Sequence, residues 1–387
     1  MEPERLGELL RGPAPGEPAA RERARLRIAE ELSRRPPERR PGGRLVAVAL
    51  AAAALALAAA LSPPGDAVAD WVRTAVGLRP HTPAVGVPAP DNRLPGGGRV
   101  LVSSGGSTWI VEANGKRRRL GAWTGASWSP HGRFVVAWRG TKLAALDPRG
   151  RVRWSLVAPR PVTEALWSPS GFRVAYRAGG ELRVVAGDGT GDRTLHRATF
   201  SPIAWRPGRA HVLAHASGSH LDVLDVDTGR RPARIQLPHV TGGIAWSADG
   251  RRLYANLHRS IAIYDARGRR TGRIRMPGRE TVTAFAPARS GALVAVARRV
   301  PSEASSEVAL MRPGARPRVL FRAEGRFTRL RFSPSGHWLL VAWPEADQWV
   351  FLQPGGSGAA RVLTAPRVTR RMGSRGFPQL SGWCCPP

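Results

Sequence analysis

One pattern occurs six times from residue 128 onward, and a seventh aromatic anchor closes the series; this repeat constrains the fold more than any other feature. An aromatic residue is followed by small or polar residues, usually with Pro or Gly among them, and then by an alternating hydrophobic run, as in WSPHGRFVVAW and WSPSGFRVAY. Such a period near 40 residues, with several short strands in each repeat, predicts the blades of a β-propeller. The anchors, spaced by 39, 38, 41, 39, 47 and 51 residues, are Trp128, Trp167, Trp205, Trp246, Phe285, Phe332 and Trp383.

The repeat around the second anchor shows how one blade is built. We expect its four strands at 163–167, 173–177, 182–186 and 193–196, with the aromatic anchors filling the layer between neighbouring sheets. Gly, Pro, Ser and Asp between the strands favour tight turns. The glycine-rich segment 187–192 leads from one strand into another and not into a helix, so we interpret it as a hairpin turn and not as a phosphate-binding loop.

The two ends of the repeat region complement each other. Residues 99–120 supply three strands without an anchored first strand, whereas 378–385 supply one anchored first strand with nothing after it. Together they make one composite blade. We therefore predict an all-β, seven-bladed propeller over 98–387, closed by exchange of the C-terminal strand into the first blade, which leaves no open sheet edge.

The sequence before the propeller predicts a membrane anchor. Residues 45–61 (LVAVALAAAALALAAAL) are uncharged and long enough to span a bilayer, and arginines crowd the N-terminal flank, which places that side in the cytoplasm. We expect a basic cytoplasmic tail over 1–44 with a short amphipathic helix at 18–34, a transmembrane helix at 45–61 and a linker at 62–97. The alternative is a cleaved signal peptide, with a site at Ala67-Val68-Ala69.

The positive net charge of the chain has two explanations, an anionic partner or a coding bias toward arginine. The 387 residues hold 60 Lys plus Arg against 28 Asp plus Glu, a formal net charge of +32, of which residues 45–387 carry +29. All but two of the basic residues are arginines, which indicates coding bias. With the propeller outside the cytoplasmic membrane, we expect no nucleic-acid partner and instead a protein or an anionic component of the cell envelope.

The search for catalytic chemistry finds no recognised motif. GxSxG, HExxH, P-loop and calcium-loop sequences are all absent, and His211 and His215, four apart on an expected strand, are too far separated for a shared metal. We therefore expect a protein that is not an enzyme, with no metal and no cofactor. The alternative is a propeller enzyme with an unrecognised site in the central channel.

Two long connections and one cysteine pair are the candidate sites. We expect loops at 298–307 and 366–378, whose basic character suits an anionic partner. Cys384 and Cys385 are either a vicinal disulfide or two small residues that replace Ser-Pro after the last anchor. The loop residues that we expect to contact a partner are Arg298, Arg299, Glu303, Arg370, Arg371 and Arg375.

The WSPxG motif followed by an alternating strand resembles the WD-like propeller repeats of the TolB-type family, including membrane-anchored bacterial members, over about three quarters of the chain. The resemblance implies a non-catalytic extracytoplasmic binding or sensing module. A second resemblance, to membrane propellers associated with anti-sigma regulation, implies a regulator that signals to a cytoplasmic partner through the 18–34 helix. The His and Cys-x-x-Cys signature of zinc-type anti-sigma factors is absent from residues 1–80.

Overall fold

The computed structural model describes residues 87–88, 93–197, 202–217, 219–237, 243–289, 293–354 and 359–385. The predicted cytoplasmic tail, the transmembrane helix at 45–61 and the signal-peptide site lie outside these residues. Within them, no helix has the length and apolar character needed to cross a membrane. The linker predicted over 62–97 contributes to the fold at its C-terminal end, because Leu94 is buried in the core and residues 87–88 form a strand.

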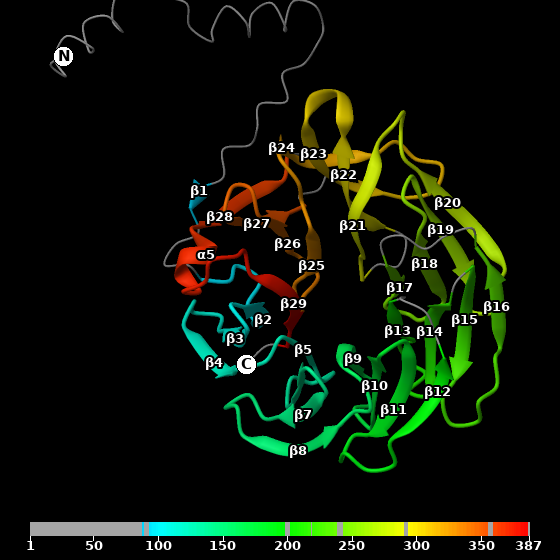
Figure 1. Ribbon diagram of the computed structural model, residues 1–387. Coiled ribbons are helices and arrows are strands. Elements are labelled where there is room, and N and C mark those ends of the chain that lie inside the picture. The colour runs from blue at the N-terminus through cyan, green and yellow to red at the C-terminus, as the bar shows by residue number, and fades with distance from the viewer. Residues whose placement is uncertain are drawn as a thin grey trace, which may run out of the picture. The chain divides into compact units, whose positions relative to one another are not determined.

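The described residues form seven β-sheets arranged in a ring, antiparallel apart from one short added strand, so the prediction of an all-β seven-bladed propeller is confirmed (Figure 1). Consecutive strands pair within each blade. Blade 1 comprises β5 (Gly125–Trp128), β6 (Val135–Arg139), β7 (Lys142–Leu146) and β8 (Val152–Val157); blade 2 comprises β9 (Val162–Trp167), β10 (Arg173–Ala178), β11 (Glu181–Ala186) and β12 (Arg193–Arg197); blade 3 comprises β13 (Ile203–Trp205), β14 (Val212–Ser217), β15 (His220–Asp225) and β16 (Ala233–Gln236).

Blades 4 to 6 repeat this order with three additions. Blade 4 comprises β17 (Ile244–Trp246), β18 (Arg252–Asn256), β19 (Ser260–Asp265) and β20 (Arg270–Arg275); blade 5 comprises β21 (Thr281–Pro287), β22 (Val294–Val300), β23 (Ser305–Met311) and β24 (Arg318–Glu324), with the 3-10 turn η2 (Pro301–Glu303) between its middle strands. Blade 6 comprises β25 (Arg329–Phe332), β26 (Leu339–Trp343), β27 (Gln348–Gln353) and β28 (Arg361–Pro366), with β1 (Val87–Pro88) added in parallel to β28, and is followed by α5 (Val368–Arg371).

Blade 7 is the composite blade, predicted from the sequence as the first blade, and it is assembled from both ends of the described chain. Its strand order is β29 (Gln379–Cys384), β2 (Arg99–Ser104), β3 (Ser107–Val111) and β4 (Arg117–Gly121). β29 runs antiparallel to β2, and Trp383 stands opposite Val100 in the register. A register shift between Leu101 and Val102 accompanies this pairing.

The recurrent Ser-Pro-x-Gly segment folds as the turn between the first and second strands of a blade. In blade 1 the Ser129 hydroxyl oxygen accepts a hydrogen bond from the backbone N–H of Phe134 at 2.9 Å, and Gly132 adopts a φ of 63°, which a glycine tolerates at no steric cost. The serine thus satisfies a backbone donor that the turn would otherwise bury. The same bond recurs at Ser168, Ser247 and Ser333.

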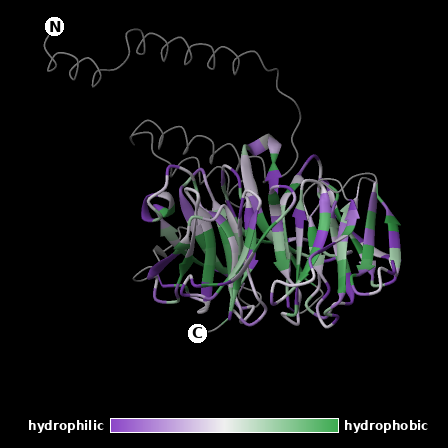
Figure 2. Cartoon of the chain, turned by 60° about the horizontal axis from the view of Figure 1, so that its bottom comes forward, coloured by the Kyte–Doolittle hydropathy of each residue, from purple (hydrophilic) through white to green (hydrophobic). Residues whose placement is uncertain are grey.

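The hydrophobic core lies between the blades. Each hydrophobic cluster among the described residues joins two neighbouring sheets, as where Leu143 of blade 1 packs with Trp167 and Tyr176 of blade 2. Figure 2 shows hydrophobic residues concentrated along the strands. Alternating residues reach opposite neighbours, since Leu101 packs toward blade 1 and Val100 toward blade 6. Each fully buried aliphatic side chain contributes roughly 1.5–3 kcal/mol.

Candidate functional site

The candidate functional site is a cavity of about 870 Å³ where the innermost strands end, at the face that carries the Ser-Pro turns. Trp383, Trp128, Trp167 and Trp205 come from β29, β5, β9 and β13, which are consecutive innermost strands, and Arg331 comes from β25, the innermost strand of blade 6, which lies beside β29 (Figure 1). Because the lining spans so many blades, the cavity is the mouth of the central channel. We call it the tryptophan mouth.

The four tryptophans are not equivalent. Trp205 donates its indole N–H to the carbonyl oxygen of Leu166 in the preceding blade at 3.0 Å, and this fixes its ring. The indole N–H groups of Trp128 and Trp167 are buried and have no hydrogen-bond partner among the described residues. The Trp128 ring instead lies under the Arg99 guanidinium, 4.9 Å from its centroid, in a cation–π contact.

The charge at the tryptophan mouth is positive. Arg331, Arg289 and His131 line it, and within the described part of the chain no acidic residue does. Arg331 donates to the backbone carbonyl of Leu330 at 3.0 Å, and no carboxylate of the described residues lies within ion-pair distance of it. Burial, together with the neighbouring Arg329, lowers the pKa of Arg331 to about 10. The structure thus holds a cation in the channel at an electrostatic cost that a bound anion would reduce.

An acidic group lies on the same wall as the tryptophan mouth. Glu164 precedes Leu166, which lines the mouth, on β9, and one Glu164 oxygen lies 3.7 Å from Arg177. Burial raises the pKa of Glu164 to about 7, although Arg177 and Arg329 oppose the shift.

A disulfide joins Cys384 and Cys385 at the rim of the tryptophan mouth. The Cys385 sulfur lies 3.5 Å from the carbonyl oxygen of Pro130, in the Ser-Pro turn of blade 1. Of the two arrangements that the sequence left open for this pair, the structure contains the vicinal disulfide. Its position makes it part of the wall between blades 7 and 1.

The loop predicted at 298–307 is wrong in its boundaries. β22 extends to Val300, and β23 begins at Ser305. Arg298 and Arg299 therefore lie within β22, where they pair with Glu307 and Ser306 of β23. The Arg298 side chain is buried, 2.7 Å from Glu280 and 2.9 Å from Glu307. Arg298 is therefore a structural cation and not a loop residue open to a partner.

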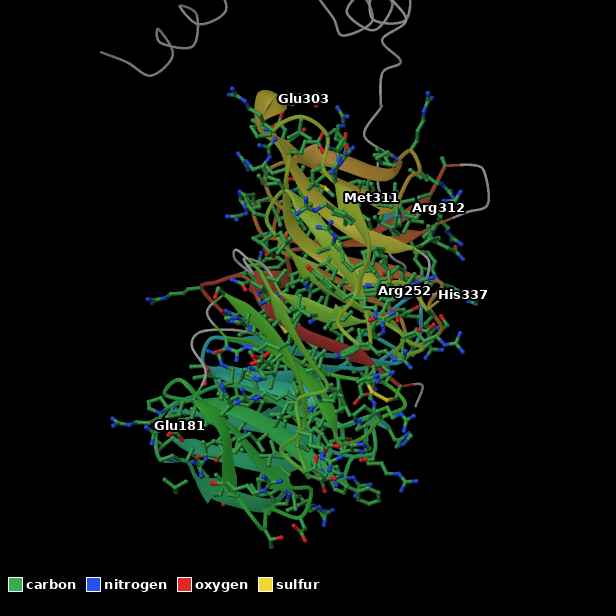
Figure 3. All side chains as sticks on the ribbon, turned by 90° about the vertical axis from the view of Figure 1, so that its right-hand side faces the viewer. Glu181, Arg252, Glu303, Met311, Arg312 and His337 are labelled. Atoms are coloured by element: carbon green, nitrogen blue, oxygen red, sulfur yellow. A yellow bond between two sulfur atoms is a disulfide. The ribbon has the colours of Figure 1, made fainter. Side chains whose placement is uncertain are left out.

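The remaining predicted contact residues lie at the opposite face from the tryptophan mouth. Glu303 is in η2 and pairs with Arg322 at 2.6 Å, whereas Arg370 and Arg371 end α5 and Arg375 follows it. Both segments connect strand ends that are one strand length away from the Ser-Pro turns, and they belong to different blades. Figure 3 shows the two faces, with His337 and Arg252 on one side and Glu181 on the other.

The sequence named the tryptophans of the mouth as structural anchors but missed Arg331. A signal for it exists. In β25 (RLRF), Arg329 and Arg331 flank the fully buried Leu330. Successive residues of a strand point to opposite faces, so both arginines lie on the face opposite Leu330. A charged residue immediately before an anchor, on an innermost strand, therefore predicts a channel residue such as Arg331.

Comparisons with known proteins give a likeness of fold. No protein-family model and no curated protein matches the sequence. Among solved structures, hydrazine synthase of Kuenenia stuttgartiensis has a TM-score of 0.52 at 16% identity, covering 60% of this chain and 76% of that one. A chain of the mitotic checkpoint complex has a TM-score of 0.50 at 17% identity, covering 62% and 75%. The β-propeller domain of Myceliophteria thermophila Cps50 (Swd1) has a TM-score of 0.49 at 17% identity, covering 69% and 88%. At such identities, the similarity concerns the fold alone.

Proposed function

We propose that the protein is a non-catalytic binding module, without a cofactor, that holds an acidic segment of a partner protein at the tryptophan mouth. The observation that carries the proposal is that Arg331 lines the channel mouth without a carboxylate partner in the described part of the chain. Indole rings beside it provide flat apolar surface, and aromatic residues and arginine are the residue types enriched where partners bind. Arg331 would pair with an Asp or Glu side chain of an extended peptide, and the indole rings would contact its apolar parts.

The expected contribution of Arg331 follows from the strength of charge-assisted hydrogen bonds. Such a bond contributes roughly 1.5–3 kcal/mol, or about ten- to hundredfold in affinity. Arg289 is exposed at the rim and should add less, because exposed ion pairs contribute only about 0–1 kcal/mol.

Fluorescence anisotropy of labelled octaglutamate and octaglutamine peptides with the full-length protein tests the proposal. We expect octaglutamate to bind more tightly and Arg331→Gln to weaken it by about tenfold or more. Arg312→Gln is the matched control, because Arg312 is an exposed arginine that lies at the same face but does not line the mouth. Equal losses in the two variants would reduce the interaction to diffuse surface charge and overturn the proposal.

We further propose that this module is extracytoplasmic and anchored in a bacterial cytoplasmic membrane through residues 45–61, as in the membrane-anchored TolB-like proteins that its repeats resemble. The uncharged run and its arginine-rich N-terminal flank support this topology. Alkaline phosphatase fused after Pro387 should be active, since this reporter folds only outside the cytoplasm. An inactive fusion that is present at full length would contradict the proposed orientation.

A further inference from the structure

A second cavity, of about 200 Å³, lies at the seam between blades 6 and 7, away from the tryptophan mouth. Trp349 and Phe351, two positions apart on β27, form one wall, and Val111 of β3 lies in another. Val368 and Met372 contribute from the α5 segment. All five of these side chains are buried. The cavity therefore has an apolar interior between two sheets and a helix, and it is partly open, because Arg117, which also lines it, is exposed.

The short helix that covers this cavity is fixed in place. The Asp347 carboxylate accepts a hydrogen bond from the backbone N–H of Thr369 at 2.7 Å and another from its hydroxyl. The backbone N–H of Val368 donates to the carbonyl oxygen of Asp347 at 3.1 Å. These bonds connect α5 to the turn before β27.

Two guanidinium groups give the cavity a positive end. Arg117 of β4 and Arg371 of α5 line it, and no acidic residue of the described chain does. Their charges repel each other: burial first, and then Arg117 and Arg367, lower the pKa of Arg371, whereas Asp347 opposes this shift. A carboxylate placed between two arginines would relieve this repulsion and accept charge-assisted hydrogen bonds.

We propose that this seam cavity binds a small aromatic monocarboxylate, with its ring between Trp349 and Val368 and its carboxylate toward Arg117 and Arg371. The volume agrees with such a ligand, because an apolar cavity of about 150 Å³ accommodates benzene. Aromatic walls favour a ring through edge and face contacts. The site is independent of the tryptophan mouth, since the two cavities share no lining residue.

Isothermal titration of the full-length protein with 3-phenylpropionate, and with its neutral amide as a ligand of the same shape, tests the proposal. We expect the acid to bind about tenfold more tightly than the amide, and Arg371→Gln to remove most of that difference. Arg118→Gln is the matched control, because Arg118 neighbours Arg117 but pairs with Glu112 at 2.8 Å and does not line the cavity.

A second variant separates the cavity from its charges. Ala365 lines the cavity and is buried, so Ala365→Leu fills the space and should abolish binding of both acid and amide. If that variant does not fold, the titration of Arg371→Gln decides alone, since that substitution lies at the rim. Equal binding of acid and amide, no binding of either, or an unchanged affinity in Arg371→Gln would each overturn the proposal.

Discussion

The indole N–H of Trp383 donates a hydrogen bond of 2.7 Å to the carbonyl oxygen of Gly97, which lies 286 positions earlier in the chain. The bond adds to the pairing of β29 with β2 and connects the last strand to the segment that enters blade 7. Two other anchors use the same indole donor between blades: Trp205 donates to the carbonyl oxygen of Leu166, and Trp246 donates to that of Ala204, each in the preceding blade. At these positions an anchor stabilises the ring through a polar bond as well as through packing.

The first prediction separates the two contributions of Trp383. Trp383→Phe keeps most of the ring but removes the donor, so the free energy of unfolding should fall by about 1 kcal/mol. Trp383→Ala also removes the contact with Phe351, whose ring centroid is 5.8 Å away, and should cost about 3–5 kcal/mol. Urea unfolding monitored by circular dichroism measures both. Equal losses in the two variants would show that packing at this position contributes nothing.

The second prediction concerns Gly125, at the start of the innermost strand of blade 1. A Cβ atom at this position would lie 2.2 Å from the indole ring of Trp138, which is rigid, so Gly125→Ala should destabilise the protein by about 1–3 kcal/mol. Gly376→Ala is the control, because a Cβ there meets no atom within 4 Å and it should change stability by less than about 0.5 kcal/mol. A shift of the thermal midpoint in the control alone would contradict the packing argument.

The fold could be predicted from the sequence because each blade repeats its turn chemistry as well as its hydrophobic pattern. The four strands expected around Trp167 agree with β9 to β12 to within a residue at most ends. Ser168 accepts the same turn hydrogen bond, and Gly171 adopts the same positive φ, as the corresponding residues of other blades. The motif of one turn therefore predicts the turns that share it. Local rules and the global fold point to the same structure.

The candidate sites were harder to predict because they depend on contacts between blades. Arg298 reads as a basic loop residue, yet it is buried because Glu280 and Glu307 come close only when three strands of blade 5 pair. Arg331 reads as one more arginine in an arginine-rich chain, and its isolation in the channel is a property of the closed ring. The spacing of residues within a repeat does not predict which charged side chains meet once strands pair and the ring closes.

The third prediction tests the buried role of Arg298. Arg298→Met leaves Glu280 without its cation and Glu307 with Arg322 alone, so the loss should be about 3 kcal/mol, at the lower end of the range for breaking a buried ion pair. Arg299→Met, one position along β22 on the other face of the sheet, should cost less than about 0.5 kcal/mol. Chemical denaturation of both variants at one pH compares them, and equal stability would show that Arg298 is exposed.

The last prediction concerns His215, a buried histidine between blades 2 and 3. Its ring centroid lies 5.0 Å from that of His196, and neither of its ring nitrogens has a hydrogen-bond partner among the described residues. Burial, aided by His196 and Arg231 and opposed by Asp222, lowers the pKa of His215 to about 4. The folded protein therefore holds this imidazole neutral at pH values where the unfolded chain protonates it.

The sign of the pH dependence follows from this shift. An unfolded histidine titrates near about 6.5, so the unfolded state binds the extra proton first as the pH falls. The contribution of the neutral His215 to the free energy of unfolding is fully present above about pH 6.5. It is lost progressively toward pH 4, by up to about 3 kcal/mol. His215→Leu should be less sensitive to pH across this window, whereas His337→Leu, which removes an exposed imidazole from blade 6, should follow the wild type. Urea midpoints measured from pH 8 to pH 4 give the comparison. A constant difference between His215→Leu and the wild type over that range would show that His215 protonates equally in both states.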